Sequence, residues 1–225
     1  MKALLKKYSH IWTLSYLLIY MPWFLWLESR TVPYTSVELP IDARIPFCEY
    51  FIVPYLLWFL YVPAVFIFLF FKSRHEYYRL CKYLFTGMSI CLLICTVWPN
   101  GQLLRLDLTG HDNIFADIVG IVYKADTNTN VFPSIHVFNS LAVHMSLTNC
   151  EALRDHKGVR YGSLVLTLLI IMSTMFLKQH SVIDVCCGAT LALFGYLFFY
   201  PQKAGEEASG MAVERIGKIT QIIGA

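Results

Sequence analysis

The stretch YFIVPYLLWFLYVPAVFIFLFF, residues 50–71, runs without a charged side chain. A helix needs about 20 apolar residues to cross the hydrocarbon core of a bilayer, so this stretch predicts a membrane-spanning helix. Five further apolar segments qualify by the same criterion, namely 11–27, 80–98, 132–148, 162–177 and 182–200. The sequence therefore predicts an all-α, polytopic membrane protein: a six-transmembrane-helix bundle over residues 1–201, followed by a polar tail over 202–225.

The composition supports the same class. Of 225 residues, 57% are hydrophobic and only 15% are charged, against about 25% charged in soluble domains. This composition excludes a disordered chain, a small disulfide scaffold and an ordinary soluble globule. The net charge of +3 is too small to indicate nucleic-acid binding. The seven cysteines form no CxxC pair, which favours small buried apolar residues over a zinc site.

Basic and acidic connections alternate along the chain. Segments 72–82 and 149–161 carry an excess of Lys and Arg, whereas 28–49 and 99–131 carry an excess of Asp and Glu. By the positive-inside rule, we predict a plasma-membrane protein with both termini and the basic connections in the cytoplasm. The acidic connections and the short connection 177–182 then face the extracytoplasmic side.

Three segments outside the central spans also have an interpretation. The first span, 11–27, follows a basic start but precedes no small-residue cleavage site, which indicates a retained signal anchor. Within the loop 99–131, apolar residues over 113–124 recur at helical spacing and predict a helix lying along the membrane interface. Residues 202–225 are consistent with a weak surface helix, to which we assign no chemistry.

Three groups of polar residues are predicted on the extracytoplasmic side. The first, Phe132-Pro133-Ser134-Ile135-His136, opens the fourth span. Proline suits the first turn of a helix, and the free backbone N–H groups of that turn bind anions. Ser134 adds a hydroxyl donor, and His136 lies near whatever these N–H groups bind.

The second group, residues 178–184, lies between the fifth and sixth spans. His180 and Asp184 are four residues apart and share a face of a helix. A carboxylate there accepts the imidazole Nδ1–H and leaves Nε2 free as a nucleophile or base. Lys178 adds a positive charge. The third group, Gln102-Leu103-Leu104-Arg105, lies just after the third span, and Arg105 is suited to hold a phosphate with its planar fork.

Each feature by itself also has a structural interpretation. His136 is then a helix cap, the pair of His180 and Asp184 a structural hydrogen bond, and Arg105 an anchor to lipid headgroups. Their joint occurrence on one side of the membrane favours one chemistry, which is phosphoryl transfer through a histidine.

These residues resemble signatures of the type 2 phosphatidic acid phosphatase (PAP2) superfamily. Pro133-Ser134-Ile135-His136 resembles its second signature, Pro-Ser-x-His, and His180-x-x-x-Asp184 resembles the end of its third. Lys124-Ala125-Asp126 followed by 130–137 is similar to the bacterial membrane branch. The six-span layout is similar too.

Two signatures differ from the family pattern. Arg105 matches the arginine of the first signature, Lys-x6-Arg-Pro, but Trp98 occupies the lysine position. Thr174 replaces the arginine of the third signature. We expect Lys178 and Lys124 to replace the missing cations.

The resemblance implies a phosphohistidine mechanism with no metal or other cofactor. It assigns His180 as the nucleophile, Asp184 as the residue that orients it, and His136 as the general acid and base. The predicted substrate-binding residues are Arg105, Ser134, Ile135 (through its backbone N–H), Lys178 and Lys124. The implied activity is hydrolysis of a lipid phosphate: phosphatidic acid, phosphatidylglycerophosphate, or a polyprenyl phosphate or diphosphate.

Three alternatives remain open from the sequence. An alcohol replaces water as acceptor in a lipid headgroup phosphotransferase similar to sphingomyelin or inositol phosphorylceramide synthases. A metal hydrolase would draw on His136, His144, His180 and Asp184. A non-catalytic lipid-binding membrane protein is the third. The expected partners are the lipid phosphate substrate and membrane lipids, with neither nucleic acid nor an obligatory protein partner.

Overall fold

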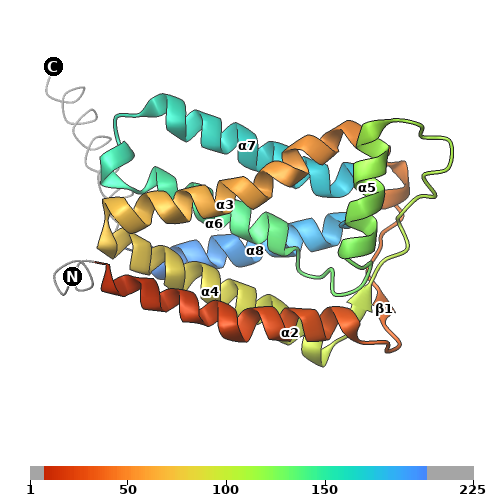
Figure 1. Cartoon of the computed structure of the whole chain (residues 1–225), viewed down its shortest axis with the longest axis horizontal. Coiled ribbons are helices and arrows are strands. Elements are labelled where there is room, and N and C mark those ends of the chain that lie inside the picture. Colours follow the sequence, from red (N-terminus) through yellow and green to blue (C-terminus); the bar gives the residue numbers. More distant parts are fainter. Residues whose placement is uncertain (1–7, 202–225) are drawn as a thin grey trace, which may run out of the picture.

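The computed structural model describes residues 8–201, and these residues are mostly helical (Figure 1). Four helices are long and apolar enough to cross a membrane: Glu49–Lys72, Arg74–Val97, Lys157–Phe176 and Val182–Phe199. The elements of the described residues are η1 (Ser9–Tyr16), α2 (Leu17–Ser29), β1 (Thr35–Ser36), η2 (Asp42–Arg44), η3 (Glu49–Phe51), α3 (Ile52–Lys72), α4 (Arg74–Val97), β2 (Asn100–Gly101), α5 (Ile114–Ala125), α6 (Ile135–Thr148), η4 (Glu151–Leu153), α7 (Lys157–Phe176) and α8 (Val182–Phe199). These apolar helices indicate a protein embedded in a membrane.

The other two predicted spans are also helical. The first consists of the 3-10 helix η1, which continues directly into α2. The fourth is α6, whose 14 residues measure about 21 Å, less than the bilayer core of about 30 Å. The predicted tail over 202–225 and the basic residues Lys2, Lys6 and Lys7 lie outside the described residues.

Helix α6 occupies the centre of the bundle, where it packs against α3, α4, α7 and α8. Most of its residues are buried, including small polar ones such as Ser140 and Ser146, whose hydroxyls donate to carbonyls one turn earlier in the helix. A helix enclosed by protein needs no long apolar run, which explains why α6 is shorter than the four long apolar helices. The central position brings its first turn close to several other elements.

The predicted basic loop 72–82 is not a loop. A single residue, Ser73, separates α3 from α4, and its hydroxyl caps α4 by accepting from the backbone N–H of Glu76. The basic residues of this segment lie on the last turn of α3 and the first turns of α4. The serine cap permits a tight reversal that the charge pattern alone did not indicate.

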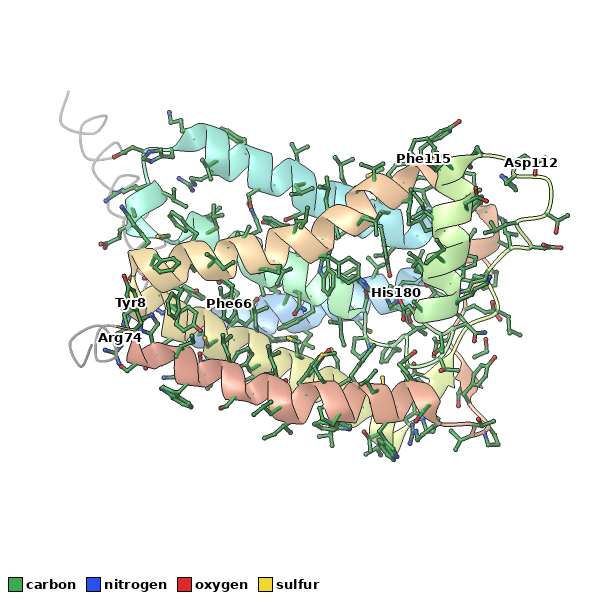
Figure 2. All side chains as sticks on the ribbon, in the orientation of Figure 1. Tyr8, Phe66, Arg74, Asp112, Phe115 and His180 are labelled. Carbon is green, nitrogen blue, oxygen red and sulfur yellow. The ribbon has the colours of Figure 1, made fainter. Side chains whose placement is uncertain are left out.

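The two ends of the bundle differ in charge. Figure 2 shows Tyr8 and Arg74 at one end and Asp112 and Phe115 at the other. The first end gathers the α3–α4 junction, η4 and the end of α8. At the opposite end, the acidic connections meet: β1 pairs in parallel with β2, and Gln102 donates to the carbonyl oxygen of Lys178. The connections that alternate in charge along the sequence therefore sort to opposite ends.

Helix α5 lies across the second end of the bundle (Figure 1). It covers the predicted segment 113–124, and Asn113 caps it by accepting from the backbone N–H groups of Phe115 and Ala116. Its buried residue Val119 packs with Ile52, Tyr55 and Leu177. A helix is therefore present over the predicted segment, and it covers the end of the bundle at which the predicted site residues lie.

All seven cysteines are free thiols. Cys81, Cys91, Cys95 and Cys150 are buried, in agreement with the prediction of small core residues, whereas Cys186 is exposed on α8.

Candidate functional site

The first turn of α6 positions His136. Ser134 is the N-cap of this helix: its hydroxyl accepts from the backbone N–H of Val137 at 3.4 Å. The backbone N–H of Ser134 donates to the carbonyl oxygen of Asp184 at 3.2 Å, which ties the start of α6 to the start of α8. Ser134 is fully buried, so its hydroxyl serves the helix cap.

The first turn of α8 positions Asp184. Ser181 and Asp184 form a capping box, in which the Asp184 carboxylate accepts from the backbone N–H of Ser181 at 2.9 Å. One turn further, a Cβ on Gly188 would lie 2.6 Å from the carbonyl oxygen of Ser134. Glycine is therefore required at this position, because it lets α8 approach the start of α6 closely.

The two helix starts bring His136, His180 and Asp184 together. Nδ1 of His136 lies 3.4 Å from Nε2 of His180, and the centres of the two rings are 5.5 Å apart. On the other side of the same ring, Nδ1 of His180 lies 3.5 Å from Oδ2 of Asp184. This last distance is a close contact without the geometry of a hydrogen bond, and His180 Nδ1 and Asp184 Oδ1 have no hydrogen-bond partner among the described residues.

A cavity of about 410 Å³ adjoins the two histidines. Figure 2 shows His180 inside the bundle, near the end that α5 covers. Aromatic side chains of α3 form one wall, with the ring of His136 at 4.4 Å from Trp58 and 4.8 Å from Tyr55, centre to centre. Ile135 also lines the cavity, at the first position of α6.

The charged residues that line this cavity are acidic. Glu28 accepts from the backbone N–H and the hydroxyl of Thr127, at 3.0 and 2.6 Å, and from the side chain of Asn130 at 3.1 Å. Asp126 accepts from the hydroxyl of Tyr55 at 3.1 Å. Burial raises the pKa of the Asp126 carboxyl, and the charges of His180 and Arg105 oppose this rise. Within residues 8–201, no lysine or arginine lines the cavity.

Arg105 lies next to the cavity and does not line it. Its guanidinium donates to the carbonyl oxygens of Tyr123 at 2.9 Å and Thr127 at 2.7 Å, and to Oε1 of Gln179 at 2.5 Å. It also stacks over the ring of Tyr123, at 4.8 Å from the ring centre. Burial lowers the pKa of Arg105, and the nearby Asp126 carboxylate opposes this shift.

The two lysines expected to replace missing cations lie elsewhere. The ammonium of Lys178 donates to the carbonyl oxygens of Asp42 at 2.8 Å and Ile45 at 2.5 Å, so it holds the η2 segment against the start of α8. Lys124 is exposed near the end of α5. Neither side chain lines the cavity.

Sequence reasoning missed Gln179, Glu28 and Tyr55. Gln179 is 2% exposed and lines the cavity beside His180. Because arginine only donates, its bond to Gln179 identifies the side-chain oxygen of Gln179 as the bonded atom, and the amide nitrogen has no partner in the described part of the chain. The position of Gln179 directly before His180 was the available signal. Glu28 was visible only as the residue after the first span.

The four candidate metal ligands do not meet. His144 lies two turns beyond His136 on α6 and contacts the hydroxyl of Ser163 on α7 at 2.9 Å. No group of three or more His, Cys, Asp or Glu side chains within residues 8–201 is arranged to hold a metal ion.

Comparison of the chain with family models, curated proteins and solved structures returns no significant match.

Proposed function

We propose that this protein is an integral membrane phosphatase that hydrolyses a phosphomonoester or diphosphate lipid through a phosphohistidine intermediate. The observation that carries the proposal is the contact of 3.4 Å between His136 and His180, with Asp184 on the far side of the His180 ring. Asp184, His180 and His136 then contact one another in sequence, as an orienting carboxylate, a nucleophile and a general acid. His136 and His180 line a cavity between the helices of the bundle.

In the first step, His180 is the nucleophile. Asp184 favours the proton on Nδ1 of His180, which leaves the lone pair on Nε2 directed toward His136. The bond from Nε2 to phosphorus forms as the bond from phosphorus to the lipid oxygen breaks, and protonated His136 gives its proton to that oxygen. The phosphoryl group takes the place of the present contact between the rings, so the rings separate when substrate binds.

In the second step, His136 acts as the base. It takes a proton from water as the water oxygen bonds to phosphorus and the bond to Nε2 breaks. Inorganic phosphate leaves, and both histidines return to their starting forms.

Neutral donors hold the phosphoryl oxygens in this proposal. The backbone N–H of Ile135 lies in the first turn of α6, where N–H groups favour anions. The amide nitrogen of Gln179 adds a second donor, held in place because Arg105 binds the oxygen of the same amide. In this proposal, these two groups bind the phosphate in place of Ser134, Lys178 and Lys124, which the sequence analysis predicted for that role.

The proposal places the site at the extracytoplasmic face of a plasma membrane. The basic end, with the α3–α4 junction and η4, is then cytoplasmic together with both termini. All six helical segments cross the bilayer, with the short α6 enclosed by its neighbours, and α5 lies along the outer interface.

A second candidate function is headgroup transfer between lipids. Glu28 and Asp126 in the cavity wall disfavour a doubly charged phosphomonoester but favour a headgroup that also carries an ammonium group. The aromatic rings of Tyr20, Phe24 and Trp58 line the same cavity and suit a bound cation. In an enzyme of this kind, Nε2 of His180 bonds to the headgroup phosphorus as the diacylglycerol oxygen leaves with a proton from His136. The hydroxyl of a lipid alcohol, which gives its proton back to His136, then bonds to the phosphorus as the bond to Nε2 breaks.

The test is a panel of lipids on purified protein in detergent, with phosphate release, headgroup transfer and phosphoenzyme measured in parallel. The panel contains phosphatidic acid, phosphatidylglycerophosphate, a polyprenyl diphosphate and phosphatidylcholine, the last with ceramide or diacylglycerol as acceptor. We expect phosphate release that His180→Ala abolishes together with phosphoenzyme labelling. The control is His144→Ala, which removes a histidine of α6 outside the site and is expected to retain activity.

Other outcomes decide between the alternatives. Headgroup transfer without phosphate release would favour the second candidate. Loss of activity in excess chelator would favour a metal hydrolase. If neither phosphate release nor labelling occurs with any lipid, the protein is not a catalyst of this class and the lipid-binding alternative stands.

A further inference from the structure

A second cavity, of about 490 Å³, lies between α3 and the segment formed by η1 and α2, with α4 as its floor. Its lining is almost entirely apolar and comes from η1 and α2 on one side and from α3 on the other. On α3 the lining residues repeat every four positions in two rows, which are Trp58, Val62, Phe66 and Phe70, and Phe59, Pro63, Ile67 and Phe71. These rows lie on one face of the helix and extend over about 20 Å.

This groove adjoins the cavity beside the histidines. Trp58 and Phe59 line both spaces. The centre of the His136 ring lies 4.4 Å from that of Trp58 and 6.5 Å from that of Phe59. The groove therefore begins one aromatic ring away from the proposed acid and base and runs toward the opposite end of the bundle.

The apolar lining of this groove favours a hydrocarbon as its ligand. Among the described residues, Asn139 is the one amide in the lining, and the other lining side chains would offer a polar ligand little in exchange for its lost hydration. The rim is open to the surroundings of the bundle through exposed apolar side chains such as Leu17 and Ile67. Trp58 lies at the junction with the cavity, and its indole N–H is buried without a partner in the described residues.

We propose that this groove holds a hydrocarbon chain of the lipid whose phosphoryl group lies between His136 and His180. This inference rests on the proposed function and deepens it: the substrate is a long-chain lipid recognised by its chain as well as by its phosphate. The chain lies along α3 between η1 and α4, and Trp58 separates it from the reacting group. Lipid phosphates with short chains leave the groove empty and are poorer substrates.

The binding test uses a phosphatidic acid that carries a diazirine in the middle of one acyl chain. After irradiation, we expect label on the groove residues of α3 and η1, and competition by dioleoyl phosphatidic acid. The double variant Leu17→Trp with Ile67→Trp fills the groove from both walls and should lose this label. Its matched control is Leu18→Trp with Leu60→Trp, which places the same side chains on exposed positions of the same helices outside the groove.

The kinetic test compares dioleoyl with dihexanoyl phosphatidic acid. The groove variant should lose at least about tenfold in kcat/KM on the dioleoyl lipid, the size of effect that one misfitted methylene has in an apolar pocket. Turnover of the dihexanoyl lipid should change by less than about twofold. The control variant should match the wild type on both lipids.

Label outside the groove, or label that phosphatidylcholine removes as well as phosphatidic acid does, would show bulk membrane lipid only and overturn the inference. An equal loss on both chain lengths would also overturn it. Specific labelling of the groove in a protein that turns over no lipid phosphate would instead retain the chain site and overturn the proposed function, so the two failures are distinguishable.

Discussion

The histidine group consists of His136, His180 and Asp184, which were predicted to be catalytic. The cation group consists of Arg105, Lys178 and Lys124, which were predicted to bind the phosphate. The structure places the two groups differently. The histidine group meets at one point, where two helix starts touch. The cation group disperses: the guanidinium of Arg105 and the ammonium of Lys178 donate to backbone carbonyls, and Lys124 is exposed.

The difference follows from how each side chain is held. The histidine group lies at or beside the capped starts of α6 and α8, so the helix register fixes where the short side chains lie. Lysine and arginine have long flexible side chains, so the position of the charged group depends on which backbone carbonyls in the nearby loops are free to accept a hydrogen bond. A motif of short side chains at helix ends is therefore a better guide to a site than a count of nearby cations.

The sharpest test of the histidine group is His136→Ala. Loss of a general acid and base costs about 100- to 10,000-fold in turnover. Because His180 and Asp184 remain, we expect phosphoenzyme to form slowly and to persist, since no base activates water. Rapid quench with a radiolabelled lipid phosphate measures both steps. Turnover equal to that of the wild type would remove His136 from the mechanism.

The next test asks whether Arg105 acts through Gln179. Gln179→Leu removes the proposed donor, and Arg105→Lys removes the planar group that binds its oxygen. We expect each to lower kcat by about a hundredfold, and the double variant to be little worse than either, because the two residues act as a unit.

The control for this pair is Arg30→Lys. Arg30 donates to the carbonyl oxygens of Cys95 and Thr96 at the same end of the bundle and does not line the cavity. Its replacement should leave kcat within about twofold. Fully multiplicative losses in the double variant of Arg105 and Gln179 would mean that Arg105 acts independently.

A third test separates structural from exposed lysines. Lys178→Met removes a buried ammonium that donates to Asp42 and Ile45, and we expect a loss of about 1.5–3 kcal/mol in the free energy of unfolding. Lys124→Met, on an exposed position, should change it by less than about 0.5 kcal/mol. Denaturation in detergent micelles measures both. Equal stability of the two variants would contradict a structural role for Lys178.

The smallest expected effect concerns Asp126. The pKa of the Asp126 carboxyl is higher in the folded state than in the unfolded state. As the pH rises from the unfolded pKa through the folded pKa, the free energy of unfolding therefore falls, because the unfolded state loses this proton first. Asp126→Asn should therefore raise the free energy of unfolding near neutral pH by up to about 1 kcal/mol, and leave it unchanged at acid pH.

The measurement is unfolding followed from about pH 4 to 8. Asp117→Asn, which changes an exposed carboxyl of α5, is the matched control. A loss of stability in Asp126→Asn at neutral pH would show that the carboxylate is stabilising and that its hydrogen bond from Tyr55 outweighs its burial.

The sequence determined the helical membrane character of this protein, the long apolar helices, and the placing of His136 and Asp184 in the first turns of helices, because apolar length and capping are local properties. The prediction that His180 shares a helix face with Asp184 was wrong, because α8 begins at Val182 after its N-cap Ser181 and His180 lies before the helix. The sequence also sorted the acidic and basic connections correctly to opposite ends of the bundle. It misplaced the break between α3 and α4, since a single capping serine was hidden in a run of charges. Only the tertiary structure decided the acidic cavity wall, the pairing of Arg105 with Gln179 and the groove along α3. These depend on contacts between residues far apart in the chain, and no local pattern records which backbone carbonyls or side chains a long polar group will meet.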